Sequence, residues 1–265
     1  MTTDDRACIA GLPGQVALVT GATRGIGQAT AHELARYGAA VVVVSLHADD
    51  AVRVAAELEE SFGTRALGLT ADVTDYAQVR ACIDAARDWG GRIDIVVNNA
   101  GYPVDDALWN TPLHEIPGAE LEDWFHKVSA VDLSGSRNVT HAVLPAMMEQ
   151  RSGAIVFVSS TPALAGHKAT PYTEAKAGVL GLMRDVALNY GKHNIRANAV
   201  APGNIATAWA EKLSAEERLA LASETPLGRW GEPAEVGQAI LFLASPLSSF
   251  VTGQTLVIDG GKVIR

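Results

Sequence analysis

The sequence contains little cysteine, and its two cysteines lie far apart. Cys8 and Cys82 form neither a CxxC pair nor a cluster with histidine, and the histidines are scattered without the spacing of metal ligands. A disulfide framework and a metal site are therefore not predicted. We expect Cys82 to be a small, buried apolar side chain.

Long apolar runs and an excess of basic residues are also missing. No run approaches the roughly 20 apolar residues that span a bilayer. The N-terminal segment, residues 1–12, lacks the basic start and apolar core of a signal peptide. The formal net charge of −9 argues against nucleic-acid binding, which needs a basic surface. We therefore expect a cytoplasmic protein that binds neither membranes nor nucleic acid.

The composition is that of a folded globular protein. Of the 265 residues, 48% are hydrophobic and 19% are charged, which excludes a largely disordered chain. This length suits one sizeable α/β domain rather than two. No linker, repeat or low-complexity stretch divides the chain, so we expect a single catalytic domain over residues 1–265.

Short β-branched runs alternate with helix-like segments. Residues 15–20 and 40–45 are typical of buried parallel strands, and residues 27–37 between them have helical spacing. This strand–helix–strand unit builds open parallel sheets. The same alternation predicts strands at 65–71, 93–98, 154–159, 195–201 and 255–258, and helices at 76–89, 122–148 and 172–190. The expected fold is a Rossmann-type, doubly wound α/β sheet of about seven strands with helices on both faces.

Two segments interrupt this alternation. Residues 102–120 contain three prolines, and residues 204–225 follow a Pro-Gly pair and are expected to form a loop plus one short helix. Both follow strands whose carboxyl ends should border the ligand site, so we expect them to face the substrate. His167 is a weaker candidate for a substrate contact. Four tryptophans could line a pocket, although large aromatic side chains more often serve packing: Trp109, Trp124, Trp209 and Trp230.

A glycine-rich turn, TGATRGIG at residues 20–27, follows the first expected strand and opens a helix. Glycine lets the backbone turn sharply and approach a pyrophosphate, and the helix points unpaired N–H groups at that charge. A tight strand–helix turn without a ligand is the alternative. The position in a strand–helix–strand unit favours dinucleotide binding.

Tyr172 and Lys176 are four residues apart in an expected helix, so their side chains share one face. A lysine ammonium near a phenol favours the phenolate, which lets the phenol exchange protons closer to neutral pH. This pairing is typical of general acid–base chemistry. A tyrosine in this place could otherwise serve only packing.

Taken together, these motifs resemble the short-chain dehydrogenase/reductase family, in its single-domain branch. The G-x-x-x-G-x-G spacing resembles the family's fingerprint, and the resemblance covers nearly the whole chain. Further matches are NNAG at 98–101, YTEAK at 172–176, PGNIAT at 202–207 and DGG at 259–261. The resemblance implies an oxidoreductase that interconverts a ketone and a secondary alcohol.

The family's chemistry implies roles for individual residues. Tyr172 would protonate the oxygen of a carbonyl whose carbon takes a hydride from NADPH. Lys176 would bind the nicotinamide ribose and pass protons from solvent. A serine would hold the carbonyl oxygen. Ser159 lies thirteen residues before Tyr172, the usual spacing, but we assign Ser160, attributing the difference to one missing residue in the loop 161–171. Strand alternation sends the two serines to opposite sides, so only one should matter.

Asp132 departs from the family pattern. The sequence Val-Asp-Leu at 131–133 stands where the family often has Val-Asn-Leu. A carboxylate could hold the same water as the asparagine, stabilise the charge of Lys176 and raise the pKa of that lysine. Alternatively, Asp132 only caps or bends the helix. The catalytic candidates are Ser160, Tyr172, Lys176 and Asp132.

The cofactor preference depends on the end of the second strand. NAD-dependent enzymes of this type usually carry a carboxylate there, whereas this chain has Ser45, which can donate to a 2′-phosphate. Arg24 can add positive charge nearby. We therefore expect NADP(H) to be favoured over NAD(H). The alternative is that Arg24 is a solvated loop residue and that Asp49 or Asp50 binds the ribose.

Asp72 and Val73 resemble the family's pair that brackets the adenine, although Asp72 could also cap the helix that begins near Tyr76. The full set of expected cofactor-binding residues is Gly21, Thr23, Arg24, Gly25, Ile26, Gly27, Ser45, Leu46, His47, Asp72, Val73, Asn99, Ala100, Gly101, Tyr172, Lys176, Pro202, Gly203, Ile205 and Thr207.

The leading interpretation is a reductase of 3-oxoacyl thioesters or similar ketones. The alternatives are a sugar or polyol dehydrogenase and, in a different class, a non-catalytic NADP-binding regulator. The expected helices 122–148 and 172–190 are apolar on more than one face. Similar proteins form tetramers through these helices, so we expect a homo-oligomer, either a tetramer or a dimer.

Overall fold

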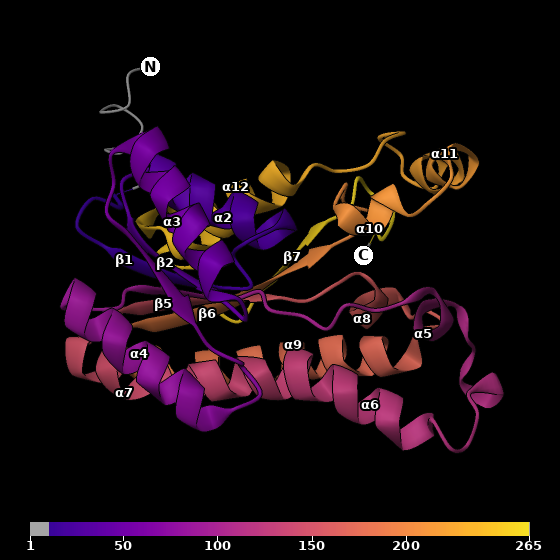
Figure 1. The fold of residues 1–265 in the computed structure, drawn as a ribbon, viewed down its shortest axis with the longest axis horizontal. Coiled ribbons are helices and arrows are strands. Elements are labelled where there is room, and N and C mark those ends of the chain that lie inside the picture. Colours follow the sequence, from indigo (N-terminus) through magenta and orange to yellow (C-terminus); the bar gives the residue numbers. More distant parts are fainter. Residues whose placement is uncertain (1–10, 265) are drawn as a thin grey trace.

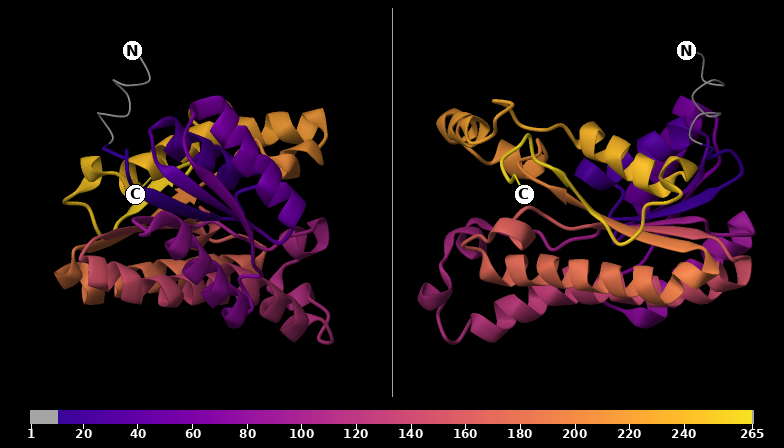
Figure 2. Two further views of the ribbon diagram at one scale, coloured as in Figure 1. Left: turned by 60° about the vertical axis from the view of Figure 1, so that its left-hand side comes forward. Right: turned by 180° about the vertical axis from the view of Figure 1, so that it is seen from behind.

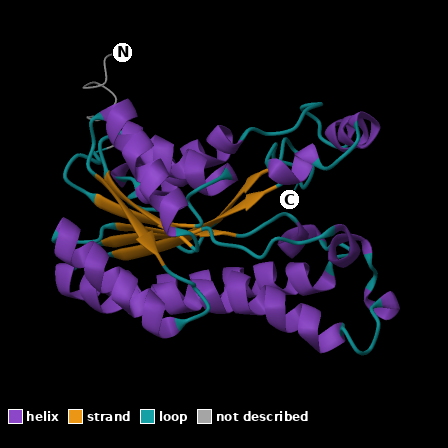
Figure 3. Ribbon diagram, in the orientation of Figure 1, coloured by secondary structure: helices purple, strands orange, loops and turns teal. Residues whose placement is uncertain are grey.

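The computed structural model describes residues 11–264, so the expectations for Cys8 and for the first ten residues lie outside it. Within this range, parallel strands form one seven-stranded sheet in the order β3-β2-β1-β4-β5-β6-β7, with helices on both faces (Figures 1 and 3). The strand order reverses between β1 and β4, the switch point at which such sheets bind ligands. The predicted Rossmann-type fold is confirmed.

The strands are β1 (Val16–Thr20), β2 (Ala40–Ser45), β3 (Ala66–Thr70), β4 (Ile95–Asn98), β5 (Gly153–Val158), β6 (Ile195–Pro202) and β7 (Thr255–Ile258). The long helices are α2 (Gly25–Arg36), α3 (Ala48–Phe62), α4 (Tyr76–Gly90), α6 (Leu121–Ser129), α7 (Ser136–Gln150), α9 (Thr170–Tyr190), α11 (Ala215–Ser223) and α12 (Pro233–Ala244). Short helices are α5 (Asp106–Asn110), α8 (Pro162–Ala165) and α10 (Ala208–Glu211).

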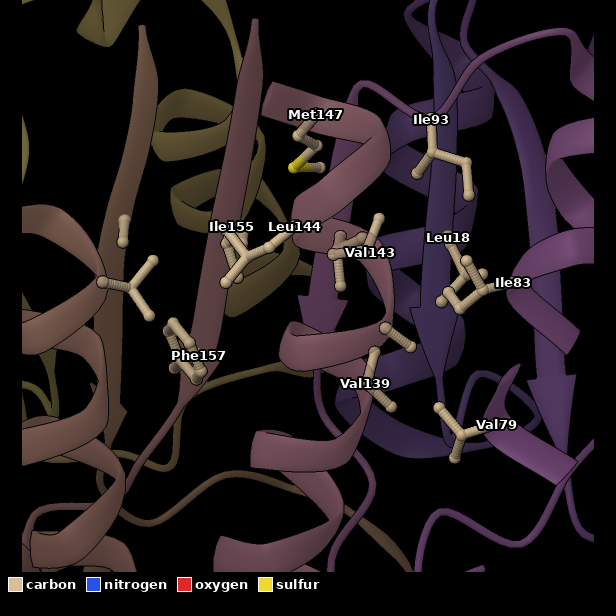
Figure 4. Packing of buried hydrophobic residues seen from close by; sticks show 14 of the residues in the cluster. Leu18, Val79, Ile83, Ile93, Val139, Val143, Leu144, Met147, Ile155 and Phe157 are labelled. Atoms are coloured by element: carbon tan, nitrogen blue, oxygen red, sulfur yellow. The ribbon is translucent and has the colours of Figure 1, made fainter. Parts of the chain in front are cut away.

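Two buried clusters hold the helices to the sheet. Residues of α2, α3 and α12 pack on one face, and residues of α4, α7 and α9 pack on the other (Figure 2). In the second cluster Leu18 of β1 meets Ile83 of α4, and Ile155 of β5 meets Leu144 of α7 (Figure 4). Each such aliphatic side chain stabilises the fold by roughly 1.5–3 kcal/mol when buried. The packing therefore holds the strands, and the loops at their ends, in position.

The expected helix at 122–148 is interrupted, which corrects the sequence-based prediction. α6 ends at Ser129, one turn of π-helix spans Ala130–Gly135, and α7 continues from Ser136. A Cβ on Gly135 would lie 2.6 Å from a methyl carbon of Val73, so the chain passes very close to the loop after β3. A π turn contains one more residue than a turn of α-helix and often occurs at a functional site. The spacing of apolar residues in the sequence does not predict such a turn.

The two irregular segments lie at the same end of the sheet. The segment with α5 and the segment with α10 and α11 project beyond the carboxyl ends of the strands in both views (Figures 1 and 2). The expectation of one short helix in 204–225 is wrong, because α10 and α11 both form; Ser214 caps α11 through a reciprocal hydrogen-bond pair with Glu217.

Two further observations concern the described residues. Cys82 is free and buried, as expected, and burial raises the pKa of its thiol to about 11, so the thiol is unreactive at neutral pH. No helix between residues 11 and 264 is both long and apolar enough to cross a membrane.

Candidate active site

The glycine-rich turn leaves the start of α2 open for an anion. Gly21 and Gly25 have positive φ angles of 63° and 55°, which favour glycine. A Cβ on Gly27 would lie 2.2 Å from the carbonyl oxygen of Gly21, so the helix packs against the turn itself. No side chain caps the first N–H groups of α2, and no acidic residue occupies its first turn. These features fit a bound pyrophosphate.

Thr20 and Asn99 fix the shape of this turn. The Asn99 side-chain amide donates to the carbonyl oxygens of Thr20 (2.9 Å) and Gly21 (3.1 Å). The Thr20 hydroxyl accepts from the backbone N–H groups of Asn99 (3.0 Å) and Ala100 (3.1 Å). Asn99 therefore joins the end of β4 to the turn after β1. Thr20 was not among the expected site residues, although it directly precedes the first glycine.

Lys176 and Asp132 form a buried ion pair. The lysine Nζ lies 2.7 Å from Asp132 Oδ1 and donates to the carbonyl oxygen of Val158 at 3.0 Å. Burial lowers the pKa of Lys176, but the Asp132 carboxylate and the phenol of Tyr172 outweigh that effect and hold the pKa above its usual value. Lys176 is therefore an ammonium ion at any pH of ordinary assay.

The π turn places Asp132 between two segments of the site. Its second carboxylate oxygen accepts the backbone N–H of Tyr102 at 2.8 Å, which ties the start of the 102–120 segment to the ion pair. Asp132 has no exposed surface. A Cβ on Gly101 would lie 3.2 Å from Asp132 Oδ1, so Gly101 borders the pair. The alternative that Asp132 merely caps or bends the helix does not account for these contacts.

The two serines after β5 differ in their surroundings. The Ser159 hydroxyl is buried and donates to the carbonyl oxygen of Lys176 at 2.9 Å, so it supports α9. Ser160 is half-buried, and its hydroxyl has one long contact, 3.5 Å to the carbonyl oxygen of Pro202. Ser160 is therefore the hydroxyl that is free to turn toward another ligand.

Tyr172 lies on the first turn of α9 beside the ion pair. Its ring centroid is 5.6 Å from the Lys176 Nζ, and the side chain is half-buried. Trp109 of α5 also makes an edge contact with the Tyr172 ring, with centroids 5.5 Å apart. Tyr172 thus lies close to both a fixed ammonium and an aromatic side chain.

The sequence pattern of a family described as enoyl-(acyl carrier protein) reductase matches residues 21–262. A 3-oxoacyl-[acyl-carrier-protein] reductase of Thermotoga maritima is 42% identical over 96% of this chain and 99% of the relative. The chain belongs to the short-chain dehydrogenase/reductase family. As a member, it is an oxidoreductase that acts on CH–OH groups with a nicotinamide dinucleotide.

Other members of the family show the same extent of similarity. An L-rhamnose 1-dehydrogenase (NAD(P)(+)) of Azotobacter vinelandii is 40% identical over 94% of this chain and 96% of the relative. The crystal structure of a 3-oxoacyl-[acyl-carrier protein] reductase from Brucella melitensis superposes with a TM-score of 0.89 at 34% identity, over 100% of this chain and 97% of that one. The similarity shows the family and the fold and leaves the substrate open.

The end of β2 carries the residues expected to select the cofactor of this family member. Ser45 is buried, and its hydroxyl accepts the backbone N–H of His47 at 3.2 Å and lies 3.5 Å from the hydroxyl of Thr23. Arg24 is exposed at the adjoining turn. Asp50 pairs with Arg53 on the surface of α3. The hydroxyls of Ser45 and Thr23 therefore lie together at the buried end of β2, and Ser45 has no carboxylate contact among the described residues.

The adenine pair and the segment after β6 occupy the expected edge of the sheet. The Asp72 carboxylate accepts from the backbone and hydroxyl of Thr74, whereas Asp75 caps α4, so the alternative of Asp72 as the helix cap is wrong. The remaining expected residues lie on the same edge: Pro202 ends β6, Gly203 packs on Asp259, Ile205 is buried, and the Thr207 methyl faces Gly25.

Proposed function

We propose that the protein is an NADP(H)-dependent enzyme that reduces a ketone to a secondary alcohol, with 3-oxoacyl thioesters and similar ketones as the leading substrate class. The observation that carries this proposal is the buried ammonium of Lys176, fixed by Asp132 and Val158 beside the phenol of Tyr172. We also propose that the protein is a single cytoplasmic domain and that it forms a dimer or tetramer. Leu188 on α9 is 83% exposed and is available for packing against a second copy.

Each catalytic candidate has one task in this proposal. Tyr172 gives its hydroxyl proton to the carbonyl oxygen during reduction and takes it back during oxidation. Ser160 donates a hydrogen bond to the same oxygen. Lys176 stabilises the phenolate that remains, and Asp132 keeps Lys176 charged and in place. General acid–base catalysis of this kind contributes typically 10²- to 10⁴-fold to a rate.

A nicotinamide dinucleotide, when bound, would supply or accept the hydride. The open first turn of α2 and the turn at Gly21 and Gly25 would hold its pyrophosphate. Ser45 and Arg24 would contact a 2′-phosphate, and the third N–H of the Lys176 ammonium would reach the nicotinamide ribose. The chain thus provides binding, position and charge, whereas the redox chemistry belongs to the cofactor.

Replacing Ser45 with aspartate should reverse the cofactor preference. A carboxylate at this buried site repels a 2′-phosphate but accepts bonds from the ribose hydroxyls of NAD(H). We expect the ratio of kcat/KM for NADPH over NADH to fall roughly 10- to 100-fold, which corresponds to about 1.4–2.8 kcal/mol. Ser249→Asp adds the same charge at an exposed position and should leave the ratio unchanged. A wild-type enzyme that prefers NADH would contradict the NADP assignment.

The function itself is tested with the purified protein and a set of carbonyl compounds. NADPH absorbance is followed with acyl thioesters and simple ketones, and NADP⁺ reduction is followed with sugars and polyols. Reduction of ketones supports the proposal, whereas turnover confined to sugars would support the dehydrogenase alternative. Tight NADPH binding without turnover of any compound would support the non-catalytic regulator.

A further inference from the structure

Four aromatic side chains form a row that starts at Tyr172. Trp109 lies next to Tyr172, Trp209 is 5.6 Å from Trp109 between ring centroids, and Trp230 is 5.8 Å from Trp209. The four residues come from α9, α5, α10 and the loop before α12. We call them the aromatic row. It joins the two irregular segments across the carboxyl end of the sheet.

The aromatic row is not part of the hydrophobic core. Trp209 and Trp230 belong to none of the three buried clusters, and Trp109 only borders the smallest of them. All three indoles are half-buried. The Trp230 indole N–H donates to the carbonyl oxygen of Arg218 at 2.9 Å, so its polar atom is satisfied while its ring remains partly open. Uncovered aromatic surface beside a reactive hydroxyl offers a stacking surface for a ligand.

The surroundings of the row contain charges of both signs. His167 stacks on Trp109 with centroids 4.3 Å apart, and burial, with Lys262 and Lys168 nearby, lowers the pKa of His167, so the imidazole is uncharged at neutral pH. The segment 102–120 contains four carboxylates and no lysine or arginine. A negatively charged substrate group would therefore gain no favourable charge interaction from this segment.

Two of the basic side chains near the row are paired with carboxylates, whereas Lys168 and Arg218 have no carboxylate partner among the described residues. Lys262 pairs with Glu224, and Arg229 forms a two-pronged pair with Glu235. Lys262 and Arg229 are therefore not free to bind a phosphate group. The aromatic surface of the row itself favours an uncharged, flat and apolar group next to the reacting carbonyl.

We propose that the substrate ketone carries an aromatic ring beside its carbonyl group, and that this ring stacks on Trp109 and Trp209. The inference rests on the proposed function, because the aromatic row matters only if Tyr172 is the proton donor. It narrows the proposed class, 3-oxoacyl thioesters and similar ketones, to those members whose carbonyl carbon carries an aryl group. Stacked aromatic pairs contribute about 0.5–1.5 kcal/mol beyond the area they bury, which corresponds to roughly a 2- to 13-fold change in affinity.

The test compares two ketones with the same number of carbon atoms, acetophenone and 2-octanone, assayed with NADPH. We expect kcat/KM to be at least about tenfold higher for acetophenone, and Trp209→Leu to reduce that preference to within about threefold. Trp209 does not touch Tyr172 in the row, so its replacement leaves the proton donor in place. Trp89→Leu is the matched control, because Trp89 is also half-buried but lies on α4 under Arg65. The control should keep the full preference.

A binding measurement separates recognition from turnover. Calorimetry of acetophenone with the NADPH-loaded Tyr172→Phe protein should give a dissociation constant that Trp209→Leu weakens roughly tenfold, with no such effect for 2-octanone. Equal kcat/KM for both ketones, or a preference that Trp209→Leu does not change, would overturn the inference while the reductase function stands. Absence of turnover with every ketone and either cofactor would instead overturn the proposed function.

Discussion

Replacing Tyr172 with phenylalanine should lower kcat about a thousandfold while the dissociation constant of NADPH changes by less than about threefold, because the substitution removes only the hydroxyl that moves the proton. The ring would remain against Trp109, and the ion pair of Lys176 with Asp132 does not depend on the hydroxyl. Steady-state rates with a ketone, together with titration of NADPH fluorescence, measure the two quantities separately.

Tyr190→Phe provides the matched control for this experiment. Tyr190 ends the same helix and packs against the core cluster far from the glycine turn, so its variant should retain wild-type kcat. If Tyr172→Phe kept more than about a tenth of the wild-type kcat, another group would have to be the proton donor. If it lost NADPH binding as well, the residue would have a structural role instead.

The sequence was sufficient to predict the sheet, because most strands are short apolar runs, several of them rich in β-branched residues, between glycines or turns. Residues 40–45, for example, are predicted and observed with the same bounds. The motif residues also converge: the glycine turn, Asn99, Lys176 and Thr207 come to one edge of the sheet although they are far apart in the chain. The motifs predict this convergence because each one lies at the end of a strand or the start of a helix, and those ends meet at one edge of the sheet.

Features that depend on long-range packing could not be read from the sequence. Gly135, in the π turn at Ala130–Gly135, closely approaches Val73, a contact between distant residues that the sequence pattern does not predict. The bond from the Tyr102 backbone to Asp132 depends on that turn. Four tryptophans were noted, but nothing in their spacing showed that three of them would meet beside Tyr172. Segments without periodicity give no prediction of their contacts.

Replacing Asp132 with asparagine should destabilise the protein by about 3 kcal/mol near pH 7, because it leaves a buried ammonium without its counter-ion. In the wild type, the folded-state pKa of Lys176 lies above the unfolded value of roughly 10.4, so the stability this pair provides is constant below that pH and is lost only above it. In the variant, burial is opposed only by Tyr172, so we expect the folded-state pKa of Lys176 to fall below the unfolded one. The unfolded state then binds more protons, so stability of the variant should rise with pH.

Thermal unfolding between about pH 7 and 9 therefore distinguishes a charged Lys176–Asp132 pair from a role of Asp132 in packing alone. Both pH values lie below the pKa of lysine in the unfolded chain. Between about pH 7 and 9 this pair should cause little change in the wild-type melting temperature. The melting temperature of Asp132→Asn should instead increase with pH. The alkaline limb of the kcat profile should also move to lower pH in the variant, by about one unit or more, since Lys176 loses its proton sooner. Asp123→Asn breaks an exposed pair with Lys127 on α6 and should alter neither profile. Parallel profiles for Asp132→Asn and wild type would mean that the carboxylate does not hold the charge of Lys176.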